Sequence, residues 1–393
     1  MLDLFFGTIL IVFSSIFLII GISAKRPKYK IDYFPPVSVI SWFWKDGNIV
    51  ERKIKNFLSQ KYPGKFEIII VDNASKDETQ KICEKYAKKG LIKYYRSPVE
   101  YDRKAFALDE AIKKVAKYDI LAMTDPDGIC KKDWLVNIVQ PFKDKHVGAV
   151  IGLTHAGNFY RNFFTKLRAI EDEWSYVISP LGRMRLGKSV QIVCGANYAV
   201  RRSALKSVGY HGKKTLGEDI ELTIKLYSKG WKVEVTNAEV WQEEVENLKE
   251  YIRQRLRWID IGIKCSEYYF RHLVNIAKRI PLGFILFFIS PGIHIFGFIL
   301  FLLVLFGLLY SLNLLVFSSI SFLILHLALI AGLIKFKRKH LIPYVPFFFI
   351  VEPIYTMYCF FLRWWIVIVK KKPIVWRSLY DGYYHRGIKM ILK

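Results

Sequence analysis

The chain has 393 residues, of which 52% are hydrophobic, and 60 Lys and Arg against 34 Asp and Glu give it a formal charge of +26. This composition excludes a disordered chain, which would lack the apolar residues needed for a core. The five cysteines form no CxxC pair, which argues against a disulfide framework or a zinc site. The apolar residues are concentrated in long runs, which suggests membrane spans. We therefore expect the positive charge to bind anionic lipid or a phosphate-bearing substrate, and we expect no binding to nucleic acid.

Three stretches of the chain are apolar enough to lie in a membrane. Residues 4–24 and 280–334 contain no charged side chain, and residues 341–369 contain only Glu352 and Arg363. Since a helix needs about 20 apolar residues to cross a bilayer, we expect one span, then two spans joined by a turn. In the third stretch, prolines would allow an interfacial or re-entrant piece plus a span. Glu352 and Arg363 would form a lipid-shielded pair or line a polar path.

Basic clusters follow the first and third expected spans, at residues 25–30 and 335–339. The positive-inside rule places both clusters in the cytoplasm. The first span has no basic residue before it, which is unlike a secretory signal. We therefore expect an integral protein of the plasma membrane whose polar region, residues 31–279, faces the cytoplasm together with any catalytic domain that it contains.

Within this polar region, apolar strands alternate with helices. The pattern predicts strands over 37–41, 66–71, 92–96 and 119–124, and helices over 48–58, 77–88, 103–116 and 219–228. Such alternation indicates an α/β fold with a doubly wound, mainly parallel sheet. Ligands in these sheets bind beyond the carboxyl ends of strands, where Asp72 and Asp125 stand.

Two acidic motifs carry candidate chemistry. The carboxylates of Asp125-Pro-Asp127 can face one divalent cation, and hard oxygen ligands suit Mg²⁺ or Mn²⁺. The competing interpretation is an ordinary turn that begins with Asp. Gly217-Glu218-Asp219 opens a helix, where carboxylates are favoured by the helix dipole. One of them is otherwise a candidate general base for a hydroxyl proton.

A basic and aromatic helical stretch contains Gln254-Arg-Leu-Arg-Trp258. We expect Arg255 and Arg257 to bind a diphosphate bidentately, and Trp258 to offer a flat face to a sugar ring. The alternative is an interfacial amphipathic helix with Arg at the headgroups and Trp as an anchor.

In this order and flanked by spans, the motifs resemble the membrane-bound glycosyltransferases of family 2. This group includes the cellulose, chitin, hyaluronan and poly-N-acetylglucosamine synthases and the ceramide glucosyltransferases. The resemblance covers residues 37–258 and implies a GT-A-like catalytic domain. The expected layout is a transmembrane helix (1–24), a basic linker (25–36), the catalytic domain (37–241), amphipathic interfacial helices (242–279), a C-terminal transmembrane region (280–370) and a basic aromatic tail (371–393).

The resemblance also implies roles for individual residues. Asp219 would be the catalytic base, and Asp127 would hold the metal. Asp72 would contact the uridine, and Arg257 would hold the leaving diphosphate. The full nucleotide-sugar set is Asp72, Lys104, Asp125, Gln254 and Arg257. The acceptor set is Gly195, Glu218 and Trp258.

Two departures from the family pattern affect the donor side. The first strand continues as Ser41-Trp-Phe-Trp-Lys45 where the family has a Pro-Ala-Tyr-Asn-like turn. Pro126 stands in the metal motif where a small residue is usual, and proline stiffens the turn without removing its carboxylates.

The implied reaction is an inverting transfer from a UDP-sugar to an acceptor hydroxyl, which would extend a polysaccharide. The alternative is a single addition to a lipid, as in the ceramide glucosyltransferases. A third interpretation is a non-catalytic membrane scaffold, which the intact acidic set argues against. Since about four spans would form a minimal channel, a polymer product would require a homo-oligomer or an accessory subunit.

Overall fold

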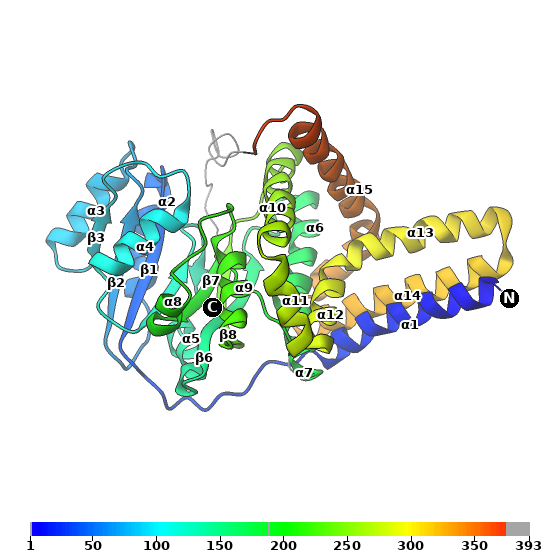
Figure 1. The fold of residues 1–393 in the computed structure, drawn as a ribbon, viewed down its shortest axis with the longest axis horizontal. Coiled ribbons are helices and arrows are strands. Elements are labelled where there is room, and N and C mark those ends of the chain that lie inside the picture. Colours follow the sequence, from blue (N-terminus) through cyan, green and yellow to red (C-terminus); the bar gives the residue numbers. More distant parts are fainter. Residues whose placement is uncertain (1, 188, 375–393) are drawn as a thin grey trace.

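The computed structural model describes residues 2–187 and 189–374, so most of the predicted basic aromatic tail lies outside the described residues. An α/β domain forms one part of the molecule, and long apolar helices project from it (Figure 1). Helices α6, α10 and α11 lie between the sheet and these projecting helices (Figure 1).

Within the described residues, one eight-stranded sheet has the order β3-β2-β1-β4-β7-β6-β8-β5. Its strands are β1 (Val37–Phe43), β2 (Phe66–Asp72), β3 (Lys93–Arg96), β4 (Ile120–Thr124), β5 (Ile129–Cys130), β6 (Val147–Ala156), β7 (Asn197–Arg201) and β8 (Lys232–Gln242). Strands β1 to β4 pair in parallel, β7 is antiparallel to both of its neighbours, and β6 pairs in parallel with β8. The predicted α/β fold is confirmed, with a mixed sheet.

The helices follow in chain order. They are α1 (Leu2–Ser23), α2 (Gly47–Leu58), α3 (Thr79–Lys88), α4 (Lys104–Lys114), α5 (Trp134–Val139), α6 (Phe163–Asp172), α7 (Ser179–Arg185), α8 (Arg202–Ser207), α9 (Glu218–Ser228), α10 (Leu248–Tyr268), α11 (Phe270–Arg279), α12 (Pro281–Ile289), α13 (Ile293–Tyr310), α14 (Leu312–Lys335) and α15 (Val345–Trp364). A π-helical segment, Glu173–Ile178, joins α6 to α7. Each predicted strand and helix up to β4, and α9, is present within about two residues of its expected bounds.

The sheet has apolar packing on both faces. Along β1, Val39 and Phe43 belong to one buried core, and Ile40 and Trp42 belong to the other. Successive strand residues point to opposite faces, so a strand buried on both faces is a continuous apolar run. The result is a rigid sheet whose edge can hold polar loops.

Strand direction brings the loops of the site together. Because β7 is antiparallel to both β4 and β6, strands β1, β2, β4, β6 and β8 all run the same way. Their carboxyl ends therefore meet at the edge where β7 begins. This is the edge at which we expected ligands.

Four helices in the described residues are long and apolar enough to cross a membrane, within residues 3–23, 293–310, 312–335 and 339–369. Helices α1, α13 and α14 lie side by side (Figure 1). Ser311 forms the predicted turn and donates a hydrogen bond to Asp3 at the far end of this bundle, 3.3 Å away. At the domain end, Lys335 donates to the carbonyl of Ile22 over 2.6 Å. The basic clusters therefore gather at the α/β domain, and their cytoplasmic orientation stays a prediction.

Helix α15 packs against α10 and α6 as well as against α13. Our expectation of a pair between Glu352 and Arg363 is wrong. Eleven residues separate them, which is about 16 Å along a helix. Glu352 instead pairs with Arg255 over 2.8 Å, and Arg363 pairs with Asp260 over 3.2 Å. The charges on α15 thus bind α10.

The linker between α1 and β1 lies along β8. Arg26 forms an ion pair with Glu239 over 2.5 Å. The side chain of Asn237 donates to the carbonyl of Pro27 over 2.7 Å, and the hydroxyl of Tyr29 donates to the carbonyl of Val235 over 3.2 Å. Contacts with both side chains and backbone of one strand fix the linker to the sheet.

Candidate active site

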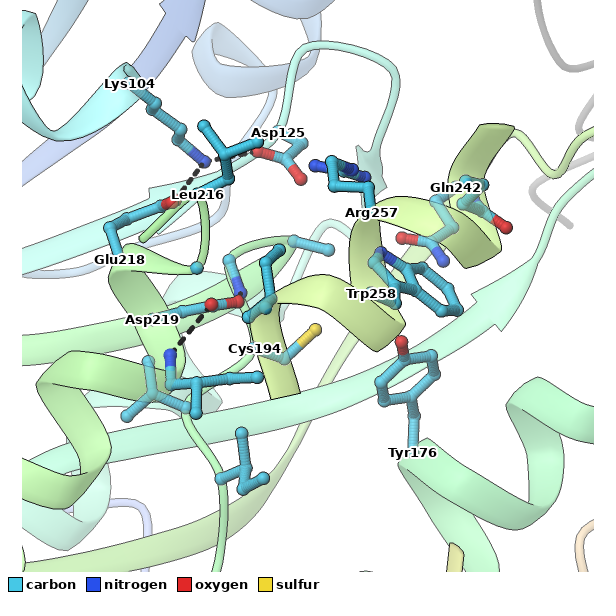
Figure 2. Close-up of a pocket in the computed structure, with 18 of the residues that line it drawn as sticks. Lys104, Asp125, Tyr176, Cys194, Leu216, Glu218, Asp219, Gln242, Arg257 and Trp258 are labelled. Carbon is cyan, nitrogen blue, oxygen red and sulfur yellow. Dashed lines mark hydrogen bonds and ion pairs between the residues drawn. The ribbon is translucent and has the colours of Figure 1, made fainter. Parts of the chain in front are cut away.

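A cavity of about 570 Å³ opens at the carboxyl edge of the sheet. The loops after β1, β4 and β8, the segment before β7, the start of α9 and one face of α10 form its walls. Figure 2 shows how side chains from these elements face one another. Asp72 and Arg255 do not line this cavity, and the other predicted site residues do: Lys104, Asp125, Asp127, Gly195, Glu218, Asp219, Gln254, Arg257 and Trp258.

Lys104 links two of the acidic motifs (Figure 2). Its ammonium lies 2.5 Å from Asp125 Oδ1 and 3.6 Å from Glu218 Oε1. Burial raises the pKa of Asp125, but the Lys104 ammonium outweighs burial and holds that pKa below its ordinary value. Burial raises the pKa of Glu218, and the neighbouring Asp219 carboxylate adds to this rise against the opposing effect of Lys104. Lys104 therefore holds Asp125 ionised beside Glu218.

Backbone amides fix the orientation of Asp219. Gly195 N donates to Asp219 Oδ2 over 2.8 Å, and Ile220 N donates to Asp219 Oδ1 over 2.8 Å. A Cβ atom at position 195 would lie 3.2 Å from Asp219 Oδ2, which is a crowded contact. The glycine therefore allows the close approach of its amide to the carboxylate. A contact between Gly195 and the acceptor stays a prediction.

Hydrogen bonds from α2 and from the residue after β8 hold the turn after β4 in place. Lys53 donates to the carbonyl of Gly128 over 2.6 Å, and Arg52 donates to the carbonyl of Asp127 over 3.3 Å. Glu243 N donates to Asp127 Oδ2 over 3.0 Å. These contacts hold the Asp127 carboxylate in the cavity wall.

The donor set of this turn fits a hard divalent cation shared with a ligand. The carboxylates of Asp125, Asp127 and Glu243 line the same cavity. In residues 2–187 and 189–374, no three His, Cys, Asp or Glu side chains converge so that they could hold an ion by themselves. Mg²⁺ usually binds one or two carboxylates and completes its shell with water and phosphate oxygens.

One face of α10 completes the cavity. Gln254, Arg257 and Trp258 are spaced at i, i+3 and i+4, which places them on one side of a helix. Figure 2 shows Arg257 pointing toward Asp125. Gln254 Oε1 is buried without a hydrogen-bond donor in the part of the chain that the structure describes, so it can accept a bond from a ligand.

Our expectation that Arg255 binds a diphosphate is wrong. Arg255 is buried and forms ion pairs with Glu171 and with Glu352. Residues two positions apart on a helix do not face the same side. Arg255 therefore points away from the cavity that Arg257 lines.

Asp72 ends β2 as expected but is fully buried and does not line the cavity. Its carboxylate accepts hydrogen bonds from Tyr94 and Arg96, both at 2.5 Å, and from Ser75 N at 2.8 Å. Ser75 Oγ in turn accepts from Lys45 N over 3.0 Å, and Lys45 lines the cavity. Asp72 thus orders the loop beside the cavity, and its contact with uridine stays a prediction.

Several lining residues were missed in the sequence. Gln242 ends β8 and Glu243 follows it at the same edge, and a predicted strand over β8 would have identified them. Tyr176 comes from the π-helical segment and Arg183 from α7. These two carry no local sequence signal, because only the tertiary fold brings them to the cavity.

The glycosyl transferase family 2 model matches residues 38–209. The chain is similar to the probable glycosyltransferase YdaM of Bacillus subtilis (strain 168), with 27% identity over 286 residues, 70% of this chain and 67% of that protein. It is also similar to the poly-beta-1,6-N-acetyl-D-glucosamine synthase of Staphylococcus aureus (strain MSSA476), with 28% identity over 266 residues, 67% of this chain and 63% of that protein. The matched region thus spans about two thirds of each relative.

A solved structure has the same fold. It is the mannosyltransferase PcManGT from Pyrobaculum calidifontis in complex with GDP-Man and Mn²⁺, with a TM-score of 0.55 and 21% identity over 89% of this chain and 92% of that chain. The family match, the curated relatives and this fold agree with the resemblance found in the motifs. The chain therefore carries a glycosyltransferase family 2 domain with the GT-A fold, joined to helices long and apolar enough to cross a membrane.

Proposed function

We propose that the protein transfers a sugar from a UDP-sugar to an acceptor hydroxyl with inversion at the anomeric carbon. The observation that carries the proposal is the single cavity in which Asp219, held by two backbone amides, faces Arg257 and the Lys104–Asp125 pair. A positioned carboxylate and a facing guanidinium are the two groups that a displacement of a diphosphate requires.

In the proposed reaction, the acceptor hydroxyl oxygen attacks the anomeric carbon from the side opposite the diphosphate. Asp219 takes the hydroxyl proton as the new carbon–oxygen bond forms and the bond to the diphosphate oxygen breaks. Arg257 stabilises the negative charge that grows on the departing UDP. One displacement without an enzyme nucleophile inverts the configuration. Mg²⁺ or Mn²⁺ bound by Asp127 would neutralise further diphosphate charge.

The acceptor has two candidates, each favoured by a different observation. The name of the Staphylococcus aureus relative, a poly-beta-1,6-N-acetyl-D-glucosamine synthase, favours extension of a polysaccharide. The cavity favours a lipid, because its wall includes Phe287 of α12 and Ser290, and none of its described lining residues comes from α1, α13, α14 or α15. The described lining therefore includes α12 and does not continue between the long apolar helices.

The experiment is a donor screen with the full chain in lipid nanodiscs. UDP-glucose, UDP-N-acetylglucosamine, UDP-glucuronate and GDP-mannose are each supplied with Mg²⁺ or Mn²⁺, and nucleotide release and product mass are measured. We expect release from one UDP-sugar, its loss on chelation with EDTA, and little release by Asp219→Asn. A high-mass polymer would select the first acceptor and a single glycolipid the second. Absence of release from every donor, or release only from GDP-mannose, would contradict the proposal.

A further inference from the structure

Arg183 is a buried cation in the wall of the cavity, with 4% of its surface exposed. Its guanidinium donates to the carbonyls of Ser179 at 3.3 Å and Val190 at 3.0 Å, and to Gln191 Oε1 at 3.5 Å. These acceptors are neutral, and no carboxylate in residues 2–187 and 189–374 forms an ion pair with it. Buried charges are ordinarily paired, because an unpaired one loses its hydration without compensation.

Arg183 remains charged although burial disfavours its charged form. Burial lowers the pKa of its guanidinium to about 10, so the group is still a cation at neutral pH. The described residues accept three of its five N–H groups, which leaves two for a ligand. A guanidinium binds phosphate through two parallel N–H groups. Its chemistry therefore selects an anion, and phosphate best.

The position of Arg183 places this anion at the membrane end of the cavity. Its neighbour Gly182 lies directly against the backbone of Ile20, in the last turn of α1. Lys25 and Arg26 follow that span at once. Charged residues that flank a span mark the level of the lipid headgroups. Arg183 thus lies at the depth where lipid phosphates are found.

The other side of Arg183 faces an apolar helix. Its guanidinium carbon lies 5.4 Å from the ring centre of Phe287 in α12. Helix α12 is nine residues long, too short to span a bilayer, and exposes Leu282, Ile285 and Phe288. A ligand that has a negative headgroup and also acyl chains would fit this pair, with the headgroup at the buried cation and the chains on the exposed apolar helix.

We propose that Arg183 binds the phosphate of a membrane lipid that serves as the sugar acceptor, with its hydrocarbon chains against α12. This inference rests on the proposed function and names the class of its acceptor. The phosphate supplies the negative charge that no carboxylate among the described residues offers to Arg183. The guanidinium anchors the lipid in the same cavity as Asp219 and takes no part in the chemical step.

The test is a binding measurement with the full chain in a non-ionic detergent, without any sugar donor. Radiolabelled dodecyl phosphate is the probe, and dodecanol and inorganic phosphate are competitors. We expect Arg183→Gln to weaken dodecyl phosphate binding at least tenfold. Arg185→Gln, at an exposed position of the same helix, is the matched control and should stay within twofold of the parent. Dodecanol and inorganic phosphate should each compete at least tenfold more weakly than unlabelled dodecyl phosphate.

Three results would overturn the inference. They are unchanged dodecyl phosphate binding in Arg183→Gln, competition by dodecanol equal to that by dodecyl phosphate, and equal competition by inorganic phosphate, which would indicate a free anion. If thermal unfolding shows that Arg183→Gln is not folded, Arg183→Lys is used in its place. We expect Arg183→Lys to weaken dodecyl phosphate binding two- to fivefold. Since the assay needs no donor, a failed donor screen with intact Arg183-dependent binding removes the proposed function and the acceptor role of the lipid, and leaves the lipid phosphate site. Transfer activity without such binding removes only this inference.

Discussion

Helix α10 separates two groups of charged residues that differ in what they bind. On one face, Arg257 lines an open cavity beside Asp125, with Gln254 and Trp258 as neighbours. On the other face, Arg255 is buried in ion pairs with Glu171 and Glu352. The same residue type, two positions apart, therefore lines an open cavity in one case and holds packed helices together in the other. Helical periodicity decides which.

Trp258 lies where the two groups meet. The guanidinium carbon of Arg255 lies 4.9 Å from its ring centre, and that of Arg168 lies 5.6 Å away. Cations over an aromatic face are attracted to it. The buried group thus supports, from behind, the indole that lines the cavity. Through Glu352 it also connects α15 to the site.

The largest expected effect is on turnover, and it comes from Asp219 in the cavity that one face of α10 lines. Asp219→Asn removes the proton acceptor but keeps the size of the side chain, so nucleotide binding should persist. General base catalysis contributes about 10²- to 10⁴-fold, and we expect turnover to fall by that factor in a nucleotide-release assay. Turnover within threefold of the parent would remove Asp219 from this role.

On the buried side, the expected effect is on folding. Arg255→Met leaves Glu171 and Glu352 without this partner, and breaking a buried ion pair costs about 3–5 kcal/mol. We expect a loss of this size in the free energy of unfolding in denaturant. Lys249→Met, at an exposed position of the same helix, is the control and should change it little. A stable Arg255→Met protein that has lost nucleotide binding would instead place Arg255 in the site.

Arg257→Ala should lower turnover and leave the stability unchanged, which is the reverse of the result expected for Arg255→Met. Removing a group that stabilises developing charge costs about 10²- to 10³-fold in turnover. Because Arg257 lines the cavity, we expect unchanged unfolding and a partial recovery of turnover in Arg257→Lys. Loss of stability without loss of turnover would show that both arginines of α10 serve packing.

The smallest effect concerns pH and the acidic pair at the start of α9. The pKa of Glu218 in the folded protein lies above its ordinary value of 4.5. The folded state therefore retains this proton more strongly, and ionising Glu218 above its folded pKa reduces stability. We expect Glu218→Gln to raise the melting temperature at pH 7–8, with the gain vanishing as the pH falls to the ordinary pKa. An equal gain at pH 4 and pH 8 would contradict this assignment.

The sequence predicts the first half of the sheet well for a physical reason. Strands such as β1 and β4 are buried on both faces and are therefore continuous apolar runs. Strands β5, β6, β7 and β8 were not predicted. Strands β5 and β7 are short, and the place of β7 between β4 and β6 depends on tertiary pairing. Lys104, Asp125 and Glu218 reach one cavity because each stands where a strand ends or a helix begins. Gln254, Arg257 and Trp258 reach it because they share one face of α10.

Residues whose roles depend on contacts far along the chain could not be predicted in this way. Asp72 stands at the expected strand end, but Tyr94 and Arg96 occupy its carboxylate. Arg183 belongs to no motif, and only the packing of α7 on α1 and α12 brings it to the cavity. The position of Arg255 was predictable from the helical repeat, which excludes a shared face with Arg257.

The linker along β8 has a consequence for how the enzyme works through successive turnovers. Contacts of Arg26, Pro27 and Tyr29 with one strand tether the sheet close to the end of α1. Under the proposed function, the acceptor hydroxyl would therefore attack at one height relative to the end of that helix. The product would then have to leave this position before the next acceptor hydroxyl could take its place.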